Sequence, residues 1–251
     1  MCGRYVLAVP PEALAALMDF HQPLPLWQPR YNIAPTQLAP VVRAAAHGES
    51  QHGPQQRGPR ELVQLRWGLV PSWAKDLSIG SRMINARSES VADKPAFRAA
   101  LRRRRCLVPA SGFYEWKKGN GAGKQPYFIH RRDGQPLAMA GLWESWNDPQ
   151  RNLPVQTFTI LTTGANAQIS QLHDRMPVIL DTAQWDQWLQ PSDTDVQQWQ
   201  SLLQPAPADL LTMHPVSRRV NSPKVDEPSL IQPEPETGET PSTERQPWLL
   251  E

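Results

Sequence analysis

The first residues of the chain, Met1-Cys2-Gly3-Arg4, carry groups that can do covalent chemistry. If Met1 is removed, Cys2 presents an α-amine and a thiol on neighbouring carbons. An α-amine with an ordinary pKa of about 8 is partly neutral near pH 7 and can condense with an aldehyde to an imine. The thiol can then close a thiazolidine ring, or it can attack an amide carbonyl as in hydrolases with an N-terminal nucleophile. A chance cysteine after the initiator methionine is the alternative.

Three further segments carry polar residues that a reaction could use. Glu115 follows an apolar and aromatic stretch, where burial would raise the pKa of its carboxyl and suit it to proton transfer. His173 can move protons at neutral pH. Asn85 and Arg87 are two residues apart and share one face if the chain is extended there. The structural alternatives are a solvent-facing strand glutamate, a hydrogen-bonding histidine, and a loop amide beside a surface arginine.

Composition excludes several classes of protein. Of the 251 residues, 39% are hydrophobic and 20% charged, a globular balance. The two cysteines, Cys2 and Cys106, are too few for a disulfide framework or a four-cysteine zinc site, and no metal or phosphate-loop motif occurs. We therefore expect no cofactor and no metal, and Cys106 reads as a buried strand residue. No apolar stretch or signal peptide indicates a membrane, so we expect a cytoplasmic protein.

Charge is distributed unevenly along the chain. Residues 221–251 hold two basic and seven acidic residues, whereas the remaining 220 residues hold 24 basic and 17 acidic ones. Prolines are frequent in the acidic segment, so residues 233–251 are predicted to be a disordered tail. The basic part, residues 1–232, is predicted to be one domain with phosphate-bearing partners.

The elements that must position these side chains follow from periodicity and from the 27 prolines, which limit long helices. Strands outnumber helices and come largely as hairpins, so an α+β fold around a curved antiparallel sheet is expected. Loops are expected at 44–60 and 117–125. Helices are predicted at 11–20, 90–105, 165–172, 182–189 and 196–203, and strands at 63–70, 106–116, 127–131, 137–143 and 155–162.

Ten segments in order resemble one known family. They are MCGRY, RYNIAPT, RWGLVPSW, INARSES, RRCLVPASGFYEWKK, QPYFI, AGLWE, FTILTTGAN, HDRMPVIL and HPVSRRVN. Over roughly residues 1–232 the chain resembles the SRAP family, the SOS response-associated peptidase-like proteins that crosslink to abasic sites in single-stranded DNA. The resemblance implies a single SRAP-type domain, built on a curved, barrel-like antiparallel sheet with short flanking helices.

The resemblance also implies roles for particular residues. Cys2, freed of Met1, is the nucleophile that forms a thiazolidine with the ring-opened sugar. Glu115 moves the protons, His173 assists and contacts the sugar or its 3′ phosphate, and Asn85 holds the Cys2 amine. The DNA contacts implied are Arg4, Arg87 and Arg175 as phosphate clamps, Trp73 and Trp116 as stacking platforms, and Thr162 as a lesser polar contact.

The function that the resemblance implies is a covalent DNA–protein crosslink at abasic sites, with lyase activity and a peptidase activity that removes Met1. The expected partner is single-stranded DNA, the protein being a monomer that acts at the bacterial nucleoid. Two rivals remain at this point. One is an N-terminal-nucleophile amidohydrolase or peptidase acting on other molecules, which needs an oxyanion hole. The other is a non-catalytic single-strand-binding module, which predicts salt-sensitive but reversible binding.

Overall fold

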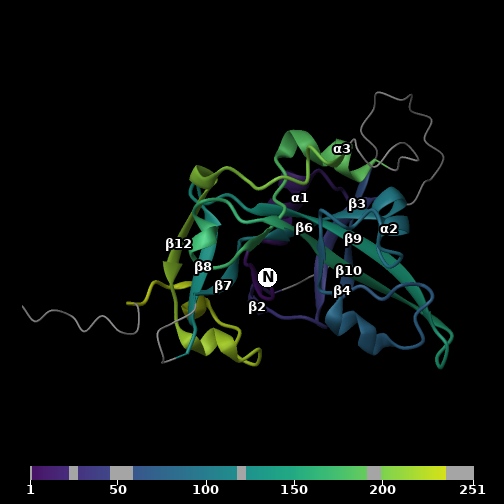
Figure 1. Cartoon of the computed structure of the whole chain (residues 1–251), viewed down its shortest axis with the longest axis horizontal. Coiled ribbons are helices and arrows are strands. Elements are labelled where there is room, and N and C mark those ends of the chain that lie inside the picture. The colour runs from purple at the N-terminus through teal and green to yellow at the C-terminus, as the bar shows by residue number, and fades with distance from the viewer. Residues whose placement is uncertain (1, 23–27, 46–58, 118–122, 191–198, 236–251) are drawn as a thin grey trace, which may run out of the picture.

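Five strands close into a barrel at the centre of the molecule (Figure 1). The computed structural model describes residues 2–22, 28–45, 59–117, 123–190 and 199–235. The barrel strands are β3 (Leu38–Ala44), β4 (Arg60–Trp67), β6 (Arg105–Ala110), β9 (Leu137–Asp148) and β10 (Leu153–Gly164). They pair in the order β10-β4-β3-β6-β9, and β9 pairs again with β10, which closes the ring.

A second, fully antiparallel sheet lies beside the barrel (Figure 1). Its strands are β1 (Tyr5–Leu7), β2 (Arg30–Ile33), β7 (Gly112–Lys117), β8 (Gln125–Arg131) and β12 (Leu211–Pro215). They are arranged in the order β12-β8-β7-β1-β2. The chain passes from the barrel into this sheet at Ser111, between β6 and β7, so the two sheets are covalently adjacent at that point.

The predicted α+β fold with a barrel-like sheet is confirmed, but not every pairing is antiparallel. Strand β10 runs parallel to β4 and to the short strand β5 (Asn85–Arg87), and antiparallel to β11 (Arg175–Pro177). The sequence predicted hairpins, which are antiparallel because a short turn reverses the chain. Strands β4 and β10 are far apart in sequence, so no turn constrains their relative direction.

The helices are shorter than the sequence predicted. They are α1 (Pro11–Met18), α2 (Arg98–Arg103) and α3 (Trp185–Leu189). The helix predicted over 90–105 is mostly turns, because Pro95 lacks the amide hydrogen that a helix interior needs. None of these three helices, nor any other in the part of the chain described, is long and apolar enough to cross a membrane.

Two other predicted helices also differ. Within 165–172 there is only the 3₁₀ turn Ile169–Gln171, whose entry is set by the Asn166 side chain accepting from the backbone amides of Gln168 and Ile169. The segment predicted as a helix over 196–203 forms turns at 199–203, and its remainder lies outside the described residues.

The predicted loops and tail are only partly visible. Lys117 pairs with Gln125 across β7 and β8, which confirms the hairpin, and residues 118–122 between them lie outside the described residues. So do residues 46–58 of the expected loop at 44–60 and residues 236–251 of the expected tail.

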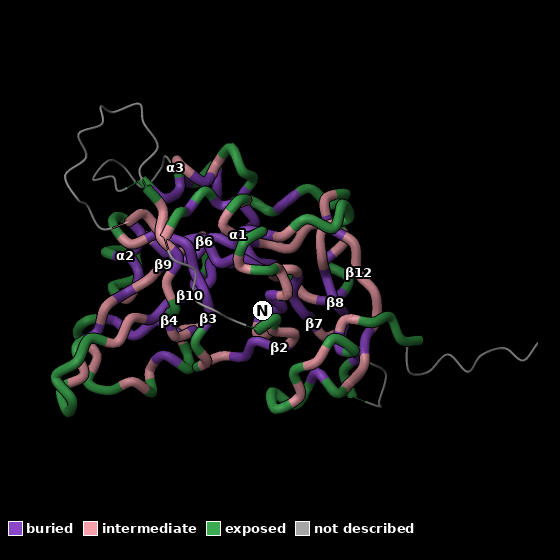
Figure 2. Tube along the Cα trace, turned by 180° about the vertical axis from the view of Figure 1, so that it is seen from behind, coloured by how far each residue is buried: buried purple, intermediate pink, exposed green. Residues whose placement is uncertain are grey.

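The core divides between the inside of the barrel and its outer face (Figure 2). Inside, Trp67 packs edge-on against Tyr5, with ring centroids 5.2 Å apart, and stacks on Phe158 at 6.3 Å. Cys106 is fully buried in β6, as predicted. Trp185, Trp188 and Trp199 belong to the outer cluster beneath the helices. Most of the tryptophans in the described residues therefore pack in the core.

One buried guanidinium ties the outer helices to the barrel. Arg105, at the start of β6, donates to the carbonyls of Leu101 and Arg102 at the end of α2, and to those of Trp188 and Gln190 at the end of α3. Burial lowers the pKa of this guanidinium to about 10, so it stays charged at neutral pH. A cation at two helix C-termini satisfies carbonyls that no helix bond can reach.

We expect Arg105→Met to lower the free energy of unfolding by about 2 to 4 kcal/mol, because several carbonyls lose a charged donor. Chemical denaturation followed by circular dichroism measures this. The matched control is Arg102→Met, which removes an exposed arginine from the same helix and should change stability by no more than about 0.5 kcal/mol. Equal losses in the two variants would contradict the assignment.

Candidate active site

Cys2 is buried where the barrel meets the second sheet. Strand β1 pairs with β7, placing Tyr5 opposite Phe113, and the Arg4 carbonyl accepts from the Tyr114 amide at 3.0 Å. This pairing brings the start of the chain alongside β7. The Cys2 side chain is fully buried. Burial, and then the nearby Glu115 carboxylate, raise the pKa of the thiol, so the resting group is the neutral thiol.

Asn85 fixes the backbone of Cys2. Its amide nitrogen Nδ2 donates to the Cys2 carbonyl oxygen at 2.8 Å. Asn85 lies in β5, whose parallel pairing with β10 places it opposite Ile160. The other amide atom, Oδ1, is buried and accepts no hydrogen bond from the described residues. Asn85 thus contacts Cys2 through the backbone carbonyl; the predicted contact with the Cys2 amine stays a prediction.

Glu115 and His173, the two residues predicted to transfer protons, lie at the same cavity. Glu115, in β7, is 2% exposed, and this burial raises the pKa of its carboxyl, while the charge of His173 acts in the opposite direction. The backbone amide of Arg175 donates to His173 Nδ1 at 3.0 Å, and the exposed Asp174 carboxylate lies 2.7 Å from the same nitrogen. These two contacts at Nδ1 fix the position of the His173 ring at the cavity.

A cavity of about 410 Å³ opens at these two residues. It is lined by Glu115, Trp116, Lys124, His173 and Asn221. The predicted catalytic pair therefore faces a space large enough for a sugar phosphate. Sequence reasoning missed Lys124 and Asn221. Lys124 lay in a segment interpreted as a loop, and Asn221 ends the HPVSRRVN segment, which was the available signal.

Arg87 and Arg175 lie on neighbouring strands at one end of β10. Arg87 pairs with Thr162, and Arg175 with Gly164. Arg87 is exposed and forms no ion pair or hydrogen bond through its side chain with the described part of the chain. Arg175 instead makes a bidentate pair with Glu89, at 2.7 and 2.9 Å, and donates to the Thr162 carbonyl at 2.6 Å.

Thr162 and Arg4 are placed differently from what the resemblance implied. Thr162 is fully buried, so its link to the site is the carbonyl that holds Arg175, not an exposed hydroxyl. Both terminal nitrogens of Arg4 donate within the protein, to Asn32 Oδ1 and to the carbonyls of Val220 and Asn221. Its role as a phosphate clamp stays a prediction.

The two predicted stacking residues have different surroundings. Trp73 is 60% exposed, on the loop that follows β4. Gly68 and Gly80 cross at the base of this loop, where a Cβ on either would lie 2.5 Å from the carbonyl oxygen of the other, and Gly68 has a φ of +116°. Trp116 is half-buried at the cavity, and its indole Nε1 donates to Asn221 Oδ1 at 2.7 Å.

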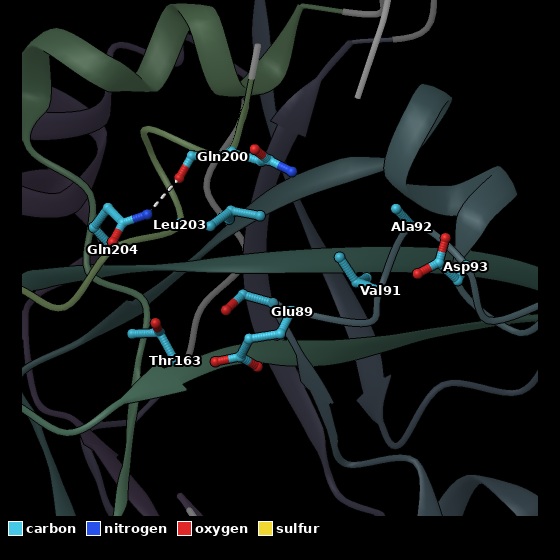
Figure 3. Close-up of a pocket in the computed structure, with 9 residues that line it drawn as sticks. Glu89, Val91, Ala92, Asp93, Thr163, Gln200, Leu203 and Gln204 are labelled. Carbon is cyan, nitrogen blue, oxygen red and sulfur yellow. Dashed lines mark hydrogen bonds between the residues drawn. The ribbon is translucent and has the colours of Figure 1, made fainter. Parts of the chain in front are cut away.

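A second cavity of about 410 Å³ lies beside the ion pair of Glu89 with Arg175 (Figure 3). Its polar side chains include Asp93, Gln200 and Gln204. Glu89 contributes to the lining while its carboxylate is engaged by Arg175. Among its described lining residues are neither Cys2 nor His173, and it shares no lining residue with the cavity at Glu115.

Comparison with known proteins identifies the family. The model of the family described as SOS response associated peptidase (SRAP) matches residues 1–223. The chain belongs to this family. It is 41% identical over 235 residues to a Bacillus subtilis protein named abasic site processing protein YoqW, which covers 92% of this chain and 99% of the relative. It is 33% identical to the chicken abasic site processing protein HMCES, covering 82% of this chain and 67% of the relative.

Solved structures of SRAP-like chains share the fold. A crystal structure of a Bacteroides thetaiotaomicron protein superposes with a TM-score of 0.79 at 24% identity, over 93% of this chain and 100% of the other. A phage-related protein from Bordetella bronchiseptica gives a TM-score of 0.64 at 28% identity, over 86% and 95%. The first likeness extends over nearly the whole chain, so the barrel with its second sheet is the fold of this SRAP protein.

The buried carboxyl of Glu115 should make the stability of this protein depend on pH. Its pKa is raised in the folded state, so the folded protein binds this proton more tightly than the unfolded chain does. The group therefore lowers the free energy of unfolding as pH rises from about 4, where an ordinary glutamate titrates, up to the raised pKa.

We expect Glu115→Gln to remove this loss and to be more stable than the wild type near neutral pH, the difference shrinking toward about pH 4. Thermal unfolding at a series of pH values measures it, with the exposed helix residue variant Glu12→Gln as the control. A difference that is constant with pH would contradict the assignment.

Proposed function

We propose that this protein processes abasic sites in single-stranded DNA by forming a covalent thiazolidine through Cys2. The observation that supports it most is the packing of the Cys2 backbone on Asn85, next to a cavity lined by Glu115 and His173. The family and the names of its relatives support the same substrate. Such a protein acts on DNA in the bacterial cytoplasm, as a monomer and without a cofactor.

The reaction needs proton transfers that Glu115 and His173 can supply. With Met1 removed, the Cys2 amine adds to C1′ of the ring-opened sugar, and the carbinolamine loses its hydroxyl as water when a proton is delivered to it. Burial raises the pKa of the Glu115 carboxyl, which favours its protonated form and suits it to deliver that proton. The Cys2 thiol then gives up its proton and adds to the protonated imine. The product contains one C–N and one C–S bond at C1′, and one water is released.

Two side reactions belong to the proposal. If the imine is not trapped by the thiol, loss of a C2′ proton expels the 3′ phosphate and cuts the strand, which is lyase activity. The peptidase activity is hydrolysis of the bond between Met1 and Cys2 by one water, which exposes the amine. His173, which lines the cavity with Glu115, is assigned to the sugar or its 3′ phosphate.

Binding of the strand is proposed to depend on charge and stacking. An abasic nucleotide has no base to read, so recognition rests on phosphates and on neighbouring bases. Arg87 is exposed with its donors available, Arg175 is held in place by Glu89, and Lys124 lines the cavity. The exposed ring of Trp73 offers a stacking surface. Arg4 and Thr162 support these DNA-contacting residues from inside the protein.

The covalent step is tested by mixing the protein with single-stranded DNA that carries one abasic site, followed by denaturing electrophoresis and intact mass. We expect a heat-stable adduct whose mass is that of the protein lacking Met1 plus the DNA, less one water. Cys2→Ala keeps the amine but not the thiol. It should form no heat-stable adduct, yet give one after borohydride reduction of the imine.

A heat-stable adduct in Cys2→Ala without reductant would place the reaction at another nucleophile. Absence of any adduct from wild type with a freed Cys2 amine would refute the crosslinking function. Release of a peptide fragment from an added protein, without an adduct, would favour the amidohydrolase instead.

The proposed contact of Arg87 with a DNA phosphate is tested by the salt dependence of binding. Each phosphate contact on a single strand contributes about 0.7 to the slope of log K against log salt. Arg87→Gln should reduce the slope by about that amount, measured by fluorescence anisotropy. Arg102→Gln, which removes an exposed arginine from α2, is the control (Figure 1). Equal slopes for the two variants would show that Arg87 does not contact a DNA phosphate.

A further inference from the structure

The hydrogen bond between Trp116 and Asn221 joins the catalytic strand to a segment near the end of the described chain. Trp116 Nε1 donates to Asn221 Oδ1 at 2.7 Å, and both residues line the cavity with Glu115. An exposed asparagine in a loop gains little from one such bond unless the loop itself is held in place. The question is therefore what fixes Asn221.

The loop that carries Asn221 is fixed by a buried asparagine. Asn32, in β2, is fully buried, and its Nδ2 donates to three carbonyls of this segment: Val220 at 3.2 Å, Ser222 at 2.9 Å and Val225 at 2.7 Å. The side-chain amide of Asn32 thus supplies the hydrogen-bond donor for three backbone carbonyls of this turn. The segment has little freedom to move away from the sheet.

Arg4 completes this attachment from the strand that carries Cys2. Its Nη1 donates to Asn32 Oδ1 at 2.9 Å and to the Val220 carbonyl at 2.7 Å, and its Nη2 donates to the Asn221 carbonyl at 3.2 Å. Asp226 closes the far end of the loop by accepting from the Tyr31 amide and from Arg30. Arg4 therefore links the segment that carries Cys2 to the Asn221 loop, and Asn32 and Asp226 link the same loop to β2.

We propose that Asn221 is a positioning residue for DNA binding, which sets the ring of Trp116 at the mouth of the cavity and is itself placed by Arg4 and Asn32. The inference rests on the proposed function, because it takes single-stranded DNA as the ligand of this cavity. Part of the Trp116 side chain is accessible, and a stacking ring is useful only in one orientation. The indole Nε1 bond sets that orientation from outside the core.

The chemical consequence is that the face of the Trp116 ring stacks on a nucleotide next to the lesion, while its indole Nε1–H is hydrogen-bonded to Asn221. Base stacking tolerates any base, so this device adds affinity without sequence preference. It also places the strand that bears the nucleophile and the loop that orients the platform on the same anchor, Arg4. The proton transfers at Glu115 do not pass through Asn221.

The test is a double-mutant cycle on binding of an oligonucleotide that contains one tetrahydrofuran, an abasic analogue without an aldehyde. Asn221→Ala removes the acceptor, and Trp116→Phe removes the donor but keeps an aromatic face. Each should weaken binding about fivefold, the size of one neutral hydrogen bond. The double variant should be no weaker than about fivefold, since either change already breaks the same bond.

Two further measurements separate positioning from damage to the structure. Asn221 is exposed, so the thermal unfolding of Asn221→Ala should match that of the wild type. Ser222→Ala, a neighbouring exposed residue of the same loop, is the matched control and should bind as the wild type does. With abasic DNA, the maximal rate of adduct formation in Asn221→Ala should stay within about twofold of wild type, so that the loss appears in binding alone.

Additive losses in the double variant, or no loss in either single variant, would overturn the proposal. So would an unchanged affinity accompanied by a lower maximal rate of adduct formation. The outcome is distinct from failure of the proposed function. If wild type forms no adduct while the binding cycle is non-additive, the crosslinking chemistry is wrong and the positioning of Trp116 stands.

Discussion

The pairing of β1 between β7 and β2 is the interaction on which the rest of the site depends. The segment before β1 carries Cys2, the nucleophile of the proposed function. Tyr5 pairs with Phe113 on one side and Ile33 on the other, and its ring packs inside the barrel against Trp67. These contacts bury Cys2 and bring it to the strand that carries Glu115. Fraying of β1 would separate Cys2 from Glu115.

Burial then determines the electrostatics of the site. It raises the pKa of the Cys2 thiol and that of the Glu115 carboxyl, because both groups lose hydration when ionised. Groups with raised pKa values keep their protons to higher pH, which under the proposed function suits a condensation that must expel water. Arg87, by contrast, is exposed. Under the proposed function, the protein thus separates a buried reaction centre from a charged surface for DNA.

Of the twelve strands in the described residues, local patterns predicted six, with β6 and β7 joined as one strand at 106–116, and missed β1, β2, β3, β5, β11 and β12. Hairpins such as β7 with β8 could be predicted, because both strands and the connection are local. The strands β5 and β11 have three residues each, too few for a periodic pattern, and exist only because β10 offers them a partner. The helix expected over 90–105 shortened at Pro95. Lys124 and Asn221 were not predicted, because the position of a residue in a loop does not indicate which cavity it borders.

The sequence by itself determined the chemical types at the site: a second-position cysteine, a glutamate within an aromatic strand, and a histidine and an asparagine in recognisable segments. Only the tertiary structure decided their partners. In the fold, Asn85 donates to the Cys2 carbonyl, Arg175 pairs with the Glu89 carboxylate, and Arg4 donates to a carbonyl of the loop that contains Asn221. The physical reason is that side-chain type is local, whereas hydrogen-bond partners, burial and the resulting pKa shifts arise from segments brought together by sheet pairing and core packing.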